Sequence, residues 1–143
     1  MPSMSIAHTV PLNAPIDVAW GKLQEEATWA GVGPISYVSN SVHTGDGILA
    51  SFEWGAEVGG KTYRGSARAA RAEPPNLIVF DMVTSEIEGK VTTELHPTGD
   101  TCEATVTMGL ATKGILSTMF FPAIKGALTT GFPEQVEDLK NRI

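Results

Sequence analysis

Three side chains that could do acid–base or nucleophilic chemistry stand at positions that the sequence pattern directs toward an apolar interior. They are His8, Tyr63 and Cys102. An imidazole exchanges protons near neutral pH, a phenol donates a hydrogen bond, and a thiolate is a nucleophile. General acid–base catalysis needs such a group within hydrogen-bond reach of the substrate, usually with a partner that tunes its pKa.

Each of these residues also has a structural interpretation. A lone histidine on an apolar face is commonly a core or rim residue that hydrogen-bonds within the protein. A tyrosine near the end of a strand, such as Tyr63, commonly packs at a rim. Cys102 has no basic neighbour in the sequence that would lower its pKa, so we expect an unreactive thiol. For His8 and Tyr63, ligand contact and packing both stay open.

The sequence has no motif for a metal, a phosphate or a serine nucleophile. His8, His43 and His96 are far apart and lack H-x-H or H-E-x-x-H spacing. No G-x-S-x-G elbow is present. The glycines at 45–47 and at 59–60 stand between predicted strands rather than between a strand and a helix, so they indicate hairpin turns. We expect no metal and no cofactor.

Alternation of apolar and polar residues predicts the strands that must position these side chains. The expected strands cover 6–12, 35–42, 48–57, 61–73, 77–84, 87–96 and 101–111. A short helical region is expected from residue 16 to about 30, loosened or divided at Gly21 and stopped by the GVGP segment at 31–34. Strands joined by such short turns pair mostly antiparallel.

The last thirty residues change to helical spacing and predict one long helix over 114–142, or two pieces of one. Gly131, Phe132 and Pro133 interrupt the pattern. Proline cannot donate to the carbonyl of Thr129, and its ring would clash with that carbonyl. We therefore expect a kink or break within a turn of Gly131, with Val136, Leu139 and Ile143 packing near the far end of the sheet.

The predicted order of elements indicates an α+β protein. A sheet with one apolar face needs a cover, and the terminal helix is the only element large enough to supply it. We expect a helix-grip architecture: a seven-stranded curved antiparallel sheet wrapped around a long C-terminal helix, with a short helical pair after the first strand. The chain of 143 residues suits a single domain over 1–143.

That order, with a set of short motifs, resembles the SRPBCC superfamily, which includes START domains and the birch-pollen-allergen fold. Within it, the chain looks most like the polyketide cyclase/dehydrase-like branch. The motifs are NAP at 13–15 followed by Trp20, Leu23 and Trp29, GDG at 45–47, EPPNLIVF at 73–80, LHPTGDT at 95–101, and Leu116 with Pro122. The resemblance implies a helix-grip fold with a cavity. Members include enzymes, lipid carriers and hormone receptors, so no single activity follows.

Strand alternation assigns the side chains that should face this cavity. The predicted ligand-binding residues are His8, Phe52, Trp54, Tyr63, Phe80, Met82, Thr93, Met108, Phe120 and Ile124. Gly65, Ala67 and Ala69 remove volume from the middle of the sheet. Large side chains fill that space, or it stays open as the pocket that the resemblance implies.

No Asp, Glu, Lys or Arg is assigned inward, which favours binding over catalysis. Three hypotheses follow: a binding protein for a small apolar or amphipathic molecule, a cyclase/dehydrase-type enzyme using His8 or Tyr63, or a protein with a filled pocket whose surface contacts other proteins.

Composition narrows the partners and the compartment. The net charge of −6 makes nucleic acid an unfavourable partner. Cys102 is the only cysteine, so no intrachain disulfide forms, which suits a reducing compartment. No segment has a secretory signal pattern or a membrane-span length of apolar residues. We expect a cytoplasmic protein with a small hydrophobic ligand and no stable membrane insertion, and the oligomeric state stays open.

Overall fold

The computed structural model describes residues 3–30, 35–58 and 60–143. Among them lie seven strands and four helices. The strands are β1 (Ser3–Leu12), β2 (Ile35–His43), β3 (Leu49–Val58), β4 (Lys61–Glu73), β5 (Leu77–Val83), β6 (Ile87–Thr98) and β7 (Thr101–Thr112). The helices are α1 (Ile16–Leu23), α2 (Glu26–Trp29), α3 (Ile115–Glu137) and α4 (Leu139–Arg142).

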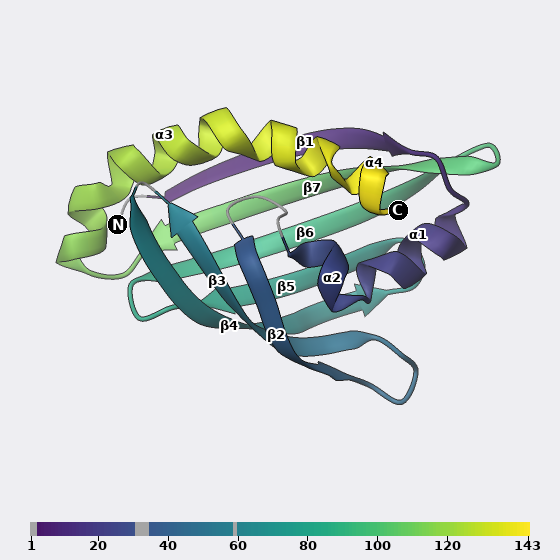
Figure 1. The fold of residues 1–143 in the computed structure, drawn as a ribbon, viewed down its shortest axis with the longest axis horizontal. Coiled ribbons are helices and arrows are strands. Elements are labelled where there is room, and N and C mark those ends of the chain that lie inside the picture. The colour runs from purple at the N-terminus through teal and green to yellow at the C-terminus, as the bar shows by residue number, and fades with distance from the viewer. Residues whose placement is uncertain (1–2, 31–34, 59) are drawn as a thin grey trace.

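The described strands form one antiparallel sheet in the order β1-β7-β6-β5-β4-β3-β2. The sheet curves, α3 lies along its concave side, and α1 and α2 lie at the end where α4 closes the chain (Figure 1). The expected α+β helix-grip architecture is therefore confirmed, including the short helical pair after the first strand. The expected helix stop at 31–34 and Gly59 of the expected turn lie outside the described residues.

The helical pair is divided after Leu23 rather than at Gly21. The next residue, Gln24, makes hydrogen bonds with its side chain to two backbone groups. The Gln24 side chain is buried, its Nε2 donates to the carbonyl of Trp20 at 3.2 Å, and its Oε1 accepts from the amide of Leu49 at 2.9 Å. Gln24 thus satisfies a backbone group at the start of β3. Helix propensities could not predict this, because the contact between Gln24 and Leu49 joins residues that are 25 positions apart.

Of the expected kink or break within a turn of Gly131, the break is wrong. α3 runs through Gly131 and Pro133 to Glu137, and the interruption lies at Asp138, before α4. Buried side chains recur on one face of the helix at Leu128, Phe132 and Val136. This packing against the sheet stabilises helical geometry more than the lost proline hydrogen bond weakens it.

The C-terminal packing follows expectation. Val136 and Leu139 are fully buried, and Ile143 packs against the core. The Arg142 guanidinium donates to the carbonyl of Ala27 at 3.1 Å and also to that of Ala30. These bonds link α4 to α2 and to Ala30, the residue that follows α2, and Figure 1 shows α4 at the same end of the molecule as α1 and α2.

The predicted inward faces are confirmed on β5, β6 and β7, where Phe80, Thr93 and Val106 are buried. At the start of β3 they are wrong. Leu49 is fully buried, whereas Ala50 is only half-buried. The register between β2 and β3 shifts here, because His43 faces Leu49 while Val42 faces Ser51. Such a bulge reverses the alternation, and sequence parity cannot show it.

Candidate functional site

A small apolar cavity lies between the concave face of the sheet and α3. Its volume is about 40 Å³, measured as the space open to the centre of a water molecule. On that measure one water takes about 10–15 Å³, so the cavity has room for about three. Its lining is Ile35, Trp54, Ala56, Tyr63, Met82, Ile87, Gly89, Val91, Met108, Leu110, Ile124 and Leu128. No charged side chain is among these lining residues.

Strand register explains why these side chains meet. Met82 of β5 faces Gly89 of β6, and Gly89 faces Leu110 of β7. Two residues along, Val91 faces Met108. Side chains two apart on a strand share a face, so both rows point toward α3.

Small and flexible residues leave this space adaptable. A Cβ built on Gly89 would be 3.4 Å or more from its neighbours, which is ordinary van der Waals contact. Met82 and Met108 have three rotatable bonds each and can adopt other shapes around an irregular guest. Two of the lining side chains, Met82 and Met108, are therefore flexible.

The polar side-chain atoms of the lining belong to two aromatic residues. Trp54 Nε1 donates to the carbonyl of Ser66 at 3.0 Å, so its hydrogen-bonding capacity is used on β4 and its ring is left for apolar contact. Tyr63 is 4% exposed and is the one titratable residue among the described lining residues. Among the described lining residues, proton transfer to or from a side chain would depend on Tyr63.

Phe52 and Phe80, predicted as ligand-binding, lie in a neighbouring aromatic cluster and not in the cavity lining. The ring centroids of Phe52 and Phe80 are 5.2 Å apart, and Phe80 meets Trp29 edge-on at 5.6 Å. Trp29 Nε1 donates to the carbonyl of Leu23 at 2.7 Å, which holds the indole in place. Because Trp29 belongs to α2, the cluster packs α2 against the rings of β3 and β5.

Gly65 was expected to leave open volume in the middle of the sheet, and it does not. A Cβ on Gly65 would lie 2.1 Å from the carbonyl oxygen of Val83, so backbone occupies the space above this glycine. Gly65 allows β4 and the end of β5 to approach closely. The small lining residues are Ala56 and Gly89 instead.

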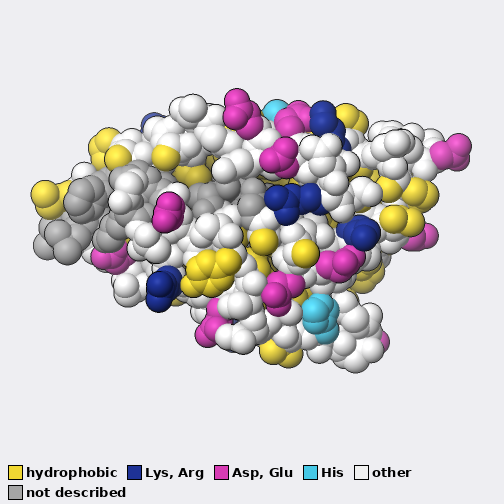
Figure 2. Space-filling model, viewed as in Figure 1, with side chains coloured by type: hydrophobic (Ala, Val, Ile, Leu, Met, Phe, Trp, Pro, Cys, Tyr) yellow, Lys and Arg dark blue, Asp and Glu magenta, His cyan; other side chains and the backbone are white. Residues whose placement is uncertain are grey.

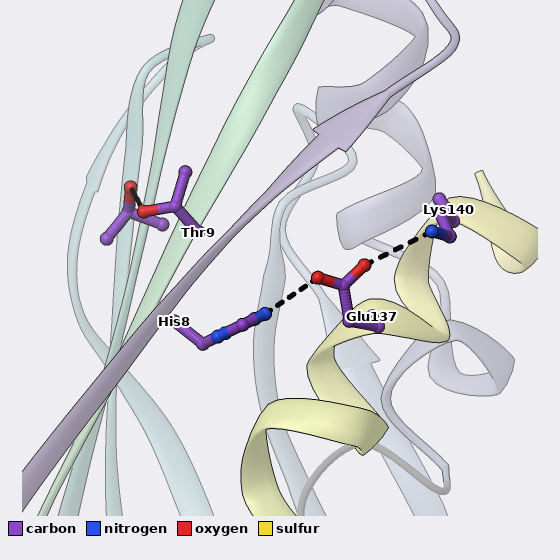
Figure 3. A network of polar contacts seen from close by, with 5 residues as sticks. His8, Thr9, Glu137 and Lys140 are labelled. Carbon is purple, nitrogen blue, oxygen red and sulfur yellow. Dashed lines mark hydrogen bonds and ion pairs between the residues drawn. The ribbon is translucent and has the colours of Figure 1, made fainter.

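His8 does not line the cavity. Its Nε2–H donates to Glu137 Oε1 at 2.8 Å, and Lys140 Nζ contacts Glu137 Oε2 at 3.2 Å (Figure 3). The hydrogen bonds from His8 and from Lys140 hold the pKa of the Glu137 carboxyl below its usual range. This network ties β1 to the C-terminal end of α3. The interpretation of His8 as a residue hydrogen-bonded within the protein fits this geometry.

Three other residues complete the set of candidates. Thr93 is 1% exposed and faces the interior, two residues along β6 from Val91. The side chain of Phe120 lies outside the described ones. Cys102 is buried, and burial raises the pKa of its thiol, which keeps the thiol protonated and unreactive.

Of the predicted ligand-binding residues, Trp54, Tyr63, Met82, Met108 and Ile124 come together around the cavity. Sequence reasoning omitted the remaining lining residues from that set. For Val91 and Leu110 the strand alternation already indicated an inward direction. For Ile35 and Leu128 it could not, because Ile35 is the first residue of its strand and Leu128 lies on the helix.

Other kinds of site considered from the sequence can be checked on the described residues. On the face shown in Figure 2, acidic and basic side chains are interspersed, and no continuous basic surface is visible among the coloured side chains. In the described part of the chain, no three His, Cys, Asp or Glu residues gather as a metal site. No described helix is both long and apolar enough to cross a membrane.

Comparisons with known proteins place this fold. No protein-family model matches the chain, and no curated protein matches it in sequence. A START superfamily protein from Mycobacterium smegmatis is similar in structure, with a TM-score of 0.65, 14% identity, and coverage of 94% of this chain and 98% of that one. The Zhui aromatase/cyclase from Streptomyces sp. R1128 is similar with a TM-score of 0.69 at 14% identity, covering 99% and 96%.

A protein from Thermus thermophilus has a TM-score of 0.71 at 14% identity, covering 99% of this chain and 96% of its own. The expected resemblance to the SRPBCC superfamily is thus confirmed as a likeness of fold. At this identity the likeness extends to the fold alone, and activity must be argued from the site.

Proposed function

We propose that this protein binds a small apolar or amphipathic molecule in the cavity between the sheet and α3. The observation that supports the proposal most is the lining, which is apolar and carries no charged side chain among the described residues. Trp54, Tyr63, Met82, Met108 and Ile124 are the proposed contacts. Ligand cavities are usually lined in this way, with a few polar groups that set orientation.

Burial of apolar surface would drive binding. Each Å² of apolar surface removed from water contributes about 25 cal/mol. The described lining residues carry no charge that a guest would have to desolvate. A molecule of drug size needs a cavity of about 300–1,000 Å³. The cavity of about 40 Å³ must therefore widen on binding, through the methionine side chains and small shifts of α3.

A second candidate is a cyclase-type reaction on a hydrophobic substrate in the same cavity. Tyr63 favours it, because its phenol is buried in the lining. The Zhui aromatase/cyclase shares the fold. The described lining holds no charged side chain that would tune a catalytic group, and His8 is engaged with Glu137. Binding alone is the simpler function for this chemistry.

The test is to detect a ligand and then to block its site. Native mass spectrometry of freshly purified protein should show a co-purified small molecule, and an apolar fluorescent probe gives a second readout. Gly89→Leu places a side chain into the cavity from β6. Gly109→Leu is the matched control, because Gly109 of β7 pairs with Lys90 on the outer face and a Cβ there meets only the Lys90 carbonyl at 3.9 Å.

We expect Gly89→Leu to lose the bound mass and the probe signal, and Gly109→Leu to keep both. A folded Gly89→Leu protein that binds like the wild type would overturn the proposal. Loss of binding in both variants would also count against it, since the effect would not be specific to the cavity.

A further inference from the structure

The most unusual polar group in the described interior is the hydroxyl of Thr93. The residue is 1% exposed, and its Oγ1 has no hydrogen-bond partner among the described residues. Buried hydroxyl groups almost always have a partner, and an unpaired one destabilises the fold. Valine has the same shape without the hydroxyl, so a purely structural position would favour it.

The neighbours of Thr93 across the sheet supply apolar contacts only. Thr93 faces Ile78 on β5 and Val106 on β7. The next residue in this row is His8 on β1, which pairs with Val106 and whose Nε2 is engaged with Glu137. Thr93 Oγ1 is thus a hydrogen-bonding group held in an apolar wall.

Thr93 continues the wall of the cavity. Val91, two residues earlier on the same face of β6, lines the cavity together with its partner Met108. Two residues along a strand span about 7 Å. A ligand that passes Val91 and displaces the flexible Met108 side chain would therefore reach the Thr93 hydroxyl.

We propose that Thr93 is the polar anchor of this cavity, and that the ligand is a neutral amphipathic molecule whose carbonyl or hydroxyl oxygen enters first. This inference rests on the proposed function. The Thr93 hydroxyl donates to a carbonyl oxygen, or exchanges hydrogen bonds with an alcohol. A carboxylate or phosphate is disfavoured as the buried end, because the described lining residues offer no counter-charge and an unpaired buried charge is very unfavourable.

The test compares two probes that differ by one oxygen. Tetralin is a fused-ring hydrocarbon, and 1-tetralone is the same ring system with a ketone. Their affinities are measured by calorimetry, and by the fluorescence of Trp54 and the other tryptophans, for the wild type and for Thr93→Val. Thr92→Val is the matched control, since Thr92 is the preceding residue and lies on the opposite face of β6.

We expect Thr93→Val to weaken 1-tetralone binding by about 5- to 10-fold, the scale of one hydrogen bond, and to leave tetralin unchanged or bound more tightly. The melting temperature of the free protein should rise, because a methyl group replaces the unpaired hydroxyl. Thr92→Val should change neither affinity.

If Thr93→Val changes the affinities for both probes equally, or changes neither, Thr93 is not the anchor, and the proposed function still holds. Binding of neither probe to the wild-type protein would overturn the proposed function and the anchor with it.

Discussion

His8 and Glu137 are 129 residues apart in the sequence and are joined by a 2.8 Å hydrogen bond from Nε2 to Oε1. The bond connects the edge strand β1 to the last turn of α3, and Lys140 contacts the other oxygen of the same carboxylate (Figure 3). It holds the end of the helix against the sheet, through residues that are not part of the cavity lining. We therefore expect this hydrogen bond to affect the stability of the fold and the way that stability depends on pH.

The first prediction concerns acid. The pKa of Glu137 is lower in the folded protein than the ordinary value near 4.5, so the charged carboxylate favours folding. This contribution is fully present above the unfolded pKa and is lost as pH falls through the lowered folded pKa. Glu137→Gln should therefore melt below the wild type at pH 6, and the gap should shrink below about pH 4.

Scanning calorimetry from about pH 3 to 7 measures that gap, a range that spans the ordinary carboxyl pKa. Glu134→Gln is the control, since Glu134 is exposed on the same helix, three residues earlier. A gap for Glu137→Gln that stays constant down to the lowest pH would contradict a charge-dependent contribution.

The second prediction separates the two roles of His8. His8→Phe removes the donor to Glu137, so the melting temperature should fall modestly, because the pair is partly exposed. Affinity for an apolar probe should stay unchanged, since His8 is not part of the lining. Calorimetric titration and melting of the same sample give both answers. Normal stability with weakened binding would make His8 a ligand contact.

The third prediction contrasts a cavity residue with a core residue. Met108→Ala enlarges the cavity and should cost about 2–3 kcal/mol of unfolding free energy, with binding of larger probes retained. Phe80→Ala removes the centre of the cluster with Trp29 and Phe52, and should cost about 3–5 kcal/mol. Urea unfolding measures both. A larger loss for Met108→Ala than for Phe80→Ala would show that the cavity and the core have been assigned the wrong way round.

The fourth prediction uses two glycines on different strands of the sheet. Gly89→Ala adds a Cβ in ordinary contact, at 3.4 Å or more, and should stabilise the protein by about 0.4–1 kcal/mol. Gly65→Ala would place a Cβ 2.1 Å from the Val83 carbonyl and should destabilise it by about 1–3 kcal/mol. Opposite signs in thermal unfolding are the expected result. Equal effects would mean that the space above the two glycines is alike.

The sequence alone determined the succession of strands along the chain and most side-chain directions. The period-two pattern on β5, β6 and β7 places Met82, Thr93 and Met108 on one face, and the structure has them there. This works because strand alternation is a local property of the backbone. The long C-terminal helix could be predicted because helical periodicity is also a local property. A sheet with one apolar face must be covered, and this helix is the element large enough to cover it.

Only the tertiary structure decided which of the inward side chains line the cavity and which belong to the packed core. Phe52 and Phe80 are buried like Met82, yet Trp29 of α2 packs against Phe80 and makes these rings part of the filled core. The bulge at Ala50, the Val83 carbonyl above Gly65 and the bond from β1 to α3 likewise depend on segments far apart in the chain or on backbone irregularity. A cavity is the volume left after all such contacts form, so no local pattern encodes it.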